Sequence, residues 1–322
     1  MYQHLNEVVA GDDLLMALLN RIEHFPRQNI LFAGVQYLML RDGGGRLAEF
    51  YPNLTDEPRP VSDVDELFKE FVMANAAELV AIGRTRYTQT NECRRCVALL
   101  PAVWATGATR FHLVDLGTSA GLNLLLDQYA YRWGDVTWGG HSSVELTTES
   151  RGVTVEPGEI DVISRTGIDL HPVDPGDPEH RRWLEALIWP EHHERGERLR
   201  AALSMAATTE MDVLAGDALT LLGPTLDALP EGEPAVVIHS FFLNQLDRPS
   251  RRRVGGLLAE SRERRPTFRV SLEALDIDNP VATLSIDSGQ GLEDIGQAQP
   301  HGEWLELQIT TPGRRRGEAS RS

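Results

Sequence analysis

The feature that most constrains the fold is a change in hydrophobic pattern near residue 110. Beyond it, short apolar runs bounded by turn residues alternate with stretches of helical periodicity. Such runs are typical of buried strands, and strands that alternate with helices predict a mostly parallel, doubly wound sheet. The sequence therefore predicts an α/β fold with a Rossmann-like sheet domain over residues 106–311.

The expected elements of this domain follow the pattern directly. Apolar runs predict strands at 111–116, 161–169, 211–214, 235–239 and 267–273, with two late strands at 281–286 and 303–310. Helical periodicity covers 122–129, 180–206 and 249–263. The segment 132–159 is rich in Trp, Gly and Thr and shows no helical period, so we expect an insertion or a hairpin there.

The first 105 residues instead predict an N-terminal helical cap. Apolar residues recur at helical spacing between Leu14 and Ile22, and the nearly continuous apolar stretch 30–40 predicts a buried helix. A further helix is expected over 91–106. At the other end, the polar, arginine-rich tail 312–322 is predicted to be disordered.

Charge and composition exclude several classes of protein. The net charge is -17 over 322 residues, which disfavours general binding to nucleic-acid phosphates. Lys69 is the single lysine, and the phosphate-loop motif of NTPases is absent. No apolar run reaches the roughly 20 residues that span a bilayer, and no secretory signal begins the chain. With two cysteines, the chain is expected to be cytoplasmic, without a membrane partner.

The chemistry is expected where the predicted strands end. Asp115 opens the turn Asp-Leu-Gly-Thr-Ser-Ala-Gly between the first strand and its helix. Such turns allow close backbone approach to a ligand, and the helix that follows supplies N–H donors. Asp169 and Asp217 follow the second and third strands, and His239 and Asn244 lie at the end of the fourth. Carboxyl ends of parallel strands meet at one edge, so these residues predict a ligand site there.

These segments resemble the class I S-adenosylmethionine-dependent methyltransferases, which carry a D/E-x-G-x-G-x-G turn. The resemblance implies that the cofactor is S-adenosylmethionine, with Asp169 on its ribose and Asp217 at its adenine. It assigns the methionine part to the turn, in which a serine replaces the middle glycine: Asp115, Gly117, Ser119, Gly121 and the adjacent Asn123.

A narrower resemblance covers nearly the whole chain. Residues 90–92 with Arg95, and the strings at 116–123, 167–174 and 183–191, are similar to an uncharacterised bacterial family of unknown function. This resemblance implies a family but no reaction.

The resulting prediction is methyl transfer from S-adenosylmethionine to an unidentified small molecule. His239 and Glu92 are the candidate bases, and Asn91, Arg95 and Asn244 are the expected lining of the substrate pocket. A string Asn-Pro-Pro-Tyr after the fourth strand would favour amino-group methylation of DNA or protein, and it is absent. The oligomeric state is left open.

Two alternatives remain open. Residues 117–121 also match the G-x-S-x-G elbow of α/β hydrolases, with Ser119 as nucleophile, Asp276 or Asp278 as the acid and His301 as the base. The helical N-terminal segment and the absence of a His-Gly-Gly-Gly loop disfavour that hydrolase. The second alternative is a non-catalytic binding protein that keeps a methyltransferase-like fold.

No metal site is predicted. Cys93 and Cys96 form a C-x-x-C pair, but a second pair of ligands with zinc spacing is missing, so both are expected in the core. The Asp and His residues between 169 and 180 lie among prolines and are interpreted as turn residues.

Overall fold

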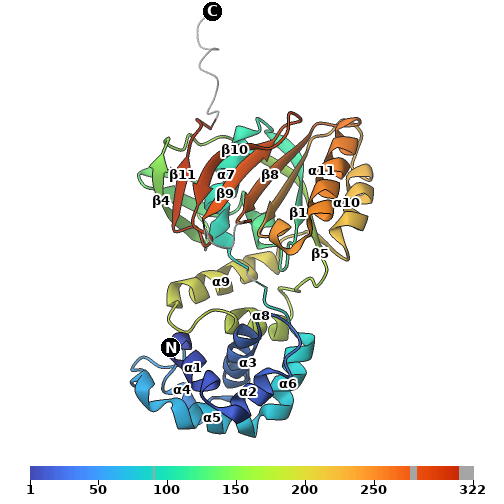
Figure 1. Ribbon diagram of the computed structural model, residues 1–322. Helices are drawn as coiled ribbons and strands as arrows, with labels where there is room; N and C mark the ends of the chain where they lie inside the picture. The colour runs from blue at the N-terminus through green and yellow to red at the C-terminus, as the bar shows by residue number, and fades with distance from the viewer. Residues whose placement is uncertain (90, 276–280, 312–322) are drawn as a thin grey trace, which may run out of the picture. The chain divides into compact units, whose positions relative to one another are not determined.

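A computed structural model describes residues 1–89, 91–275 and 281–311 (Figure 1). It divides the chain into two compact units. The helical unit comprises Met1–Asn91 and Asp174–Ser204, and the sheet unit comprises Glu92–Val173 and Met205–Ser322. The division differs from the boundary expected at residue 105. The predicted tail disorder at 312–322 lies outside the described residues, as do Asp276 and Asp278 of the hydrolase alternative.

The helical unit is built around one buried helix, as the apolar stretch 30–40 predicts. Its helices are α1 (Tyr2–Ala10), α2 (Asp13–Leu19), α3 (Arg27–Asp42), α4 (Gly45–Ala48), η1 (Val61–Asp63), α5 (Asp65–Ala74), α6 (Ala76–Thr85), α8 (Pro178–Ala186) and most of α9 (His193–Ala206). Helix α8 joins this unit because Trp183 and Ala186 are buried in its core. The amide of Gln36, on α3, donates to three carbonyls at the end of α8, those of Glu185, Ala186 and Ile188.

The sheet unit contains a large, mostly parallel sheet, which confirms a mixed α/β fold. Its strands are β1 (Arg110–Leu116), β2 (Ala130–Trp133), β3 (Val136–Trp138), β4 (Glu145–Gly152), β5 (Asp161–Asp169), β6 (Asp212–Ala215), β7 (Ala235–Ser240), β8 (Thr267–Glu273), β9 (Ala282–Asp287), β10 (Glu293–Ala298) and β11 (Trp304–Leu307). The order across the sheet is β3-β2-β4-β11-β10-β9-β8-β7-β1-β5-β6, and β6, β5, β1, β7 and β8 pair in parallel throughout.

Helices cover both faces of this sheet (Figure 1). Helices α10 (Ala218–Asp227) and α11 (Arg248–Arg262) pack on one face, where they meet Val114, Leu116 and Val237. Helix α7 (Cys96–Ala105) packs against β4, β8 and β9 on the other face. Because side chains alternate along a strand, Asp115 points to the face opposite Val114 and Leu116. Short 3-10 turns complete the unit: η2 (Cys93–Arg95), η3 (Leu122–Leu125) and η4 (Leu243–Gln245).

Several elements differ from their sequence prediction. Residues 122–129 form only the short turn η3, and the stretch 180–206 is divided into α8 and α9 around Pro190. The segment 132–159 contains β3 and β4. Strand β3 forms an antiparallel hairpin with β2, and β4 pairs in parallel with β11. Strand β10 was not predicted, because its sequence is polar and carries little apolar alternation. No helix in the described residues is long and apolar enough to cross a bilayer.

Candidate functional site

The candidate site lies at the carboxyl edge of the parallel strands. Strand β1 has β5 on one side and β7 on the other, so the chain order reverses direction at β1. In open α/β sheets, ligands bind outside the carboxyl ends of the strands at such a switch point. The turn that begins at Gly117 follows β1 at this position.

The backbone of this turn has an unusual conformation. Gly117, Ser119 and Gly121 all have φ between +50° and +74°, a region that favours glycine. A Cβ atom at Gly121 would lie 2.5 Å from Sδ of Met211. Ser119 tolerates φ +50° because its N–H donates to Oδ2 of Asp169 at 2.8 Å, and the other Asp169 oxygen accepts the N–H of His171 at 2.8 Å. Asp169 therefore holds the turn against the end of β5.

Asp115 is buried directly beneath the turn, with an exposed fraction of 1%. The Thr118 hydroxyl donates to Oδ2 of Asp115 at 2.9 Å, and no donor among the described residues reaches Oδ1. Gly167 makes room for Thr118, because a Cβ at position 167 would overlap the threonine side chain. Burial raises the pKa of Asp115 to about 7, partly opposed by the Thr118 hydrogen bond. The carboxyl group can therefore change charge near neutral pH.

A second polar cluster joins η2 and η3 to the end of β7. Ser240 accepts from Nδ2 of Asn123 at 3.3 Å and from Nη1 of Arg95 at 3.4 Å. Arg95 as a residue is only 6% exposed, and its guanidinium carbon lies 4.2 Å from the ring centroid of Phe241. It also lowers the pKa of Asp115, although burial has the larger and opposite effect. Arg95 and Asn123, both predicted from the sequence, are thus brought to one place.

His239 lies in a fully buried ionic network. Strand β7 pairs with β8 so that His239 faces Ser271, which puts Arg269 and Glu273 on the same face two residues away in either direction. The Nδ1 atom of His239 lies 2.6 Å from Oε1 of Glu273, and Nε2 accepts from Nε of Arg269 at 2.9 Å. Burial lowers the pKa of His239, an effect that Glu273 opposes. Both ring nitrogens are therefore engaged by side chains of the neighbouring strand.

Glu273 also fixes the loop that follows β7. Its Oε1 atom accepts the N–H groups of Phe242 and Leu243, each at 3.1 Å. Phe241 has φ +54°, and the ring of Phe242 lies close to Gly117, where a Cβ would come within 3.1 Å of Cδ2. The network around His239 thus positions the loop that packs against the glycine turn.

The other predicted residues have more peripheral places. Glu92 is buried and accepts the N–H of Arg94 at 3.2 Å as the cap of η2. Asp217 is exposed and caps α10 by accepting from Leu219 at 2.9 Å. Asn244 is exposed within η4, and Asn91 belongs to the helical unit.

Sequence reasoning missed Glu273 and Arg269. Neither follows a recognisable motif, and their contact with His239 depends on the register between β7 and β8. The one available signal is the pair of charged residues that alternate with apolar ones in the strand sequence Thr-Phe-Arg-Val-Ser-Leu-Glu. A charged side chain pointing into a doubly covered sheet needs a partner there.

Both cysteines are buried and unbridged, as expected for core residues. Sγ of Cys96 lies 3.5 Å from Oδ1 of Asn123, and burial raises the pKa of its thiol. Within the ranges that the structure covers, no group of three or more His, Cys, Asp or Glu side chains has the arrangement of a metal site.

Comparison with known proteins gives one match. A family model described as "Uncharacterized protein conserved in bacteria (DUF2332)" matches residues 1–307. Neither the curated proteins nor the solved structures contain a significant match. The match therefore identifies a family but does not indicate a reaction.

Proposed function

We propose that this chain, which belongs to the uncharacterised bacterial family DUF2332, is an S-adenosylmethionine-dependent methyltransferase acting on a small molecule. One observation carries the proposal. The glycine turn 117–121 follows β1 at the switch point of the parallel strands and is tied by its Ser119 N–H to Asp169, the acidic residue that ends β5.

The order of the parallel strands supports a nucleotide-type ligand. Numbered along the chain, β1, β5, β6, β7 and β8 are the first to fifth parallel strands that pair around the switch point. Across the sheet they read third, second, first, fourth and fifth. This is the order of the first five strands in doubly wound dinucleotide-binding sheets.

In this proposal the turn holds the methionine part of the cofactor and the acidic residues hold the adenosyl part. Each Asp169 oxygen accepts one backbone N–H, and a carboxylate has about four lone-pair sites, so acceptor capacity for a ribose diol remains. Asp217 is exposed at the start of α10 and can accept from an adenine amino group.

The protein's contribution to methyl transfer would be orientation of the two reactants for in-line displacement. The cofactor supplies the activated methyl group. Of the two predicted bases, His239 has both ring nitrogens engaged by Glu273 and Arg269, so we assign it to positioning the loop beside Gly117. Glu92 stays the candidate base for an acceptor that must lose a proton.

Calorimetric titration with S-adenosylhomocysteine tests the proposal. We expect saturable binding by the native chain and a loss of at least about tenfold in affinity for Asp169→Asn, because one charged acceptor of the diol is removed. Asn keeps an acceptor for the Ser119 N–H. Asp135→Asn is the matched control, since this exposed carboxylate lies in the turn between β2 and β3, at the other end of the strand order. No binding by folded protein, or equal losses in both variants, would contradict the proposal.

The serine hydrolase alternative has one observation in its favour. The φ of +50° at Ser119 is the kind of strained turn on which a nucleophile elbow places its serine. A fluorophosphonate probe distinguishes the two functions: the hydrolase predicts covalent labelling that Ser119→Ala abolishes, and the methyltransferase predicts no labelling.

A further inference from the structure

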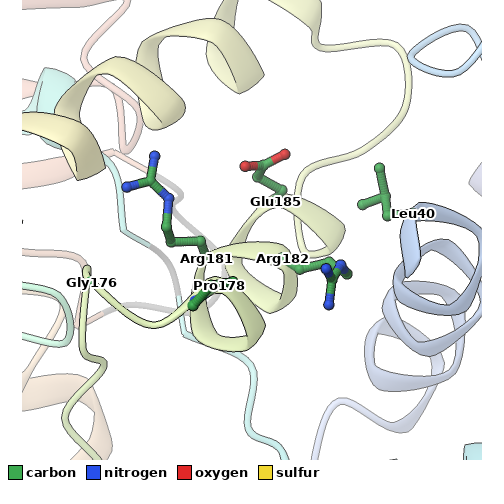
Figure 2. Close-up of a pocket in the computed structure, with 6 residues that line it drawn as sticks. All are labelled: Leu40, Gly176, Pro178, Arg181, Arg182 and Glu185. Atoms are coloured by element: carbon green, nitrogen blue, oxygen red, sulfur yellow. The ribbon is translucent and has the colours of Figure 1, made fainter.

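The helical unit contains a cavity of about 440 Å³, which is within the size range of small-molecule sites. It is formed by the turn before α8, by α8 itself and by the end of α3 (Figure 2). The lining residues are Leu40, Gly176, Pro178, Arg181, Arg182 and Glu185. None of their side chains has been assigned a role above.

Arg181 brings an unneutralised positive charge to this cavity. Its Nη2 atom donates to Oγ of Ser204 at 2.9 Å, and its Nη1 atom donates to the carbonyl of Pro175 at 3.3 Å. These neutral acceptors fix the guanidinium without cancelling its charge. In the part of the chain that the structure describes, no carboxylate lies within ion-pair distance of Arg181. A carboxylate in the cavity would satisfy its remaining donors.

Arg182 does not duplicate this role. Its guanidinium is paired with Glu179, which also accepts from the Tyr37 hydroxyl, so its charge is largely compensated within the unit. Figure 2 shows Arg182 directed toward Leu40 and α3, whereas Arg181 and Glu185 project toward α9. The free positive charge in the cavity is therefore that of Arg181.

Glu185 supplies the complementary negative charge. Its side chain is 22% exposed, and its ion pair with Arg200 is long at 3.6 Å and involves an arginine that is 53% exposed. Burial raises the pKa of Glu185 despite the neighbouring arginines, which indicates that the carboxylate is incompletely compensated. An ammonium group beside Glu185 would stabilise its partly buried carboxylate. A phosphate or other dianion there would destabilise it by charge repulsion.

We propose that this cavity binds a small zwitterion of the free amino acid type. Arg181 receives its carboxylate, Glu185 receives its ammonium group, and Leu40 and Pro178 contact its side chain. The two charged residues are four positions apart on α8, so they lie on one face of the helix about one turn apart. The cavity shares no residue with the proposed cofactor site, so either proposal can fail without the other.

The test is a thermal-shift screen of the full chain against the twenty amino acids, followed by calorimetry with the best of them. The same amino acid is then compared with two single-charge analogues, the acid without its amino group and the amine without its carboxyl group, and with inorganic phosphate. We expect at least one amino acid to bind, and each analogue to bind at least about tenfold more weakly. No stabilisation by any amino acid, or equal binding of an analogue or of phosphate, would overturn the proposal.

Variants then locate the site. Arg181→Met and Glu185→Gln are each expected to weaken binding at least about tenfold, because each removes one charge-assisted contact. Arg46→Met and Glu70→Gln are the matched controls, since both residues are exposed in the same unit and do not line the cavity. Circular dichroism verifies folding. Full binding by Glu185→Gln would contradict the zwitterion assignment, and S-adenosylhomocysteine affinity should be the same in all four variants.

Discussion

The two units of this protein differ in the charged side chains that they bury. In the described part of the helical unit, Gln36 is the one buried polar side chain apart from tyrosines and a tryptophan, and its amide is satisfied by backbone carbonyls. The sheet unit buries ionisable side chains at or near its carboxyl edge, among them Asp115, His239, Arg269 and Glu273. Burying charge costs several kcal/mol unless partners compensate it, so a fold that is merely stable has no need of this arrangement.

The difference teaches where to look for function. Perturbed ionisable groups are frequent at sites that do chemistry, and Asp115 beneath the glycine turn and His239 near the end of β7 are two such groups in this chain. In the helical unit, the charged side chains Arg182 and Glu185 are partly exposed and line a cavity, which suits binding without chemistry. The predictions that follow compare buried positions with more exposed ones, within the sheet unit and between the two units.

The largest difference is expected for two glutamates. Glu273→Ala should reduce the free energy of unfolding by about 3–5 kcal/mol, because His239 and two backbone N–H groups lose a buried partner. Glu179→Ala should cost about 0–1 kcal/mol, since its side chain is 47% exposed and water replaces its partners. Urea unfolding of both variants measures this, and equal costs would contradict the comparison.

Asp115 should make stability depend on pH. Because its pKa is raised to about 7 in the folded protein, the folded state holds a proton that the unfolded state loses near pH 4. The native chain should therefore lose up to about 4 kcal/mol relative to Asp115→Asn as pH rises from 4 to 8. His239 titrates in the opposite sense in both proteins, so it cancels in the difference. Urea unfolding across this range, with the exposed Asp135→Asn as control, measures the effect.

Two glycines of the sheet unit with a similar φ should differ in their tolerance of alanine. Gly121→Ala combines a φ of +74° with overlap against Met211 and should cost about 2–3 kcal/mol. Gly107, which follows α7, has φ +77° and open space around it, so Gly107→Ala should cost only the backbone strain of about 1 kcal/mol. Thermal unfolding of the two variants compares them, and a larger cost at Gly107 would be inconsistent with the turn geometry.

The smallest effect is expected for a surface ion pair within the sheet unit itself. Arg253 and Glu260 lie 2.7 Å apart on α11, and both side chains are more than half exposed. Arg253→Ala should change the free energy of unfolding by no more than about 0.5 kcal/mol. A cost comparable to that of Glu273→Ala would show that charge removal, rather than burial, governs these energies.

Much of the sheet could be predicted from the sequence. Strands β5 and β8 have the expected bounds 161–169 and 267–273, because both are short runs bounded by turn residues. The sequence did not predict that residues 174–204 join the helical unit, since this depends on Trp183 and Ala186 fitting its core. Strand β4 lies in the segment expected to be an insertion or a hairpin, and its bounds were not predicted because its sequence Glu-Leu-Thr-Thr-Glu-Ser-Arg-Gly is mostly polar.

Like the sheet, the candidate site could be predicted from the sequence only in part. The turn residues and Asp169 follow a local motif and lie together, as expected. His239 was placed correctly at the sheet edge, but its partners Arg269 and Glu273 come from the register of a neighbouring strand, which no local pattern encodes. The same holds for Asn123 and Arg95, whose common partner Ser240 appears only in three dimensions.

Hydrogen–deuterium exchange with and without S-adenosylhomocysteine tests the central claim most directly, because it reports both units in one experiment. We expect the ligand to slow exchange in peptides covering 115–123 and 167–171, where the turn and Asp169 lie, and to leave peptides of α8 unchanged. Unchanged exchange at the turn under saturating ligand, or protection confined to α8, would contradict the assignment of the cofactor site to the sheet unit.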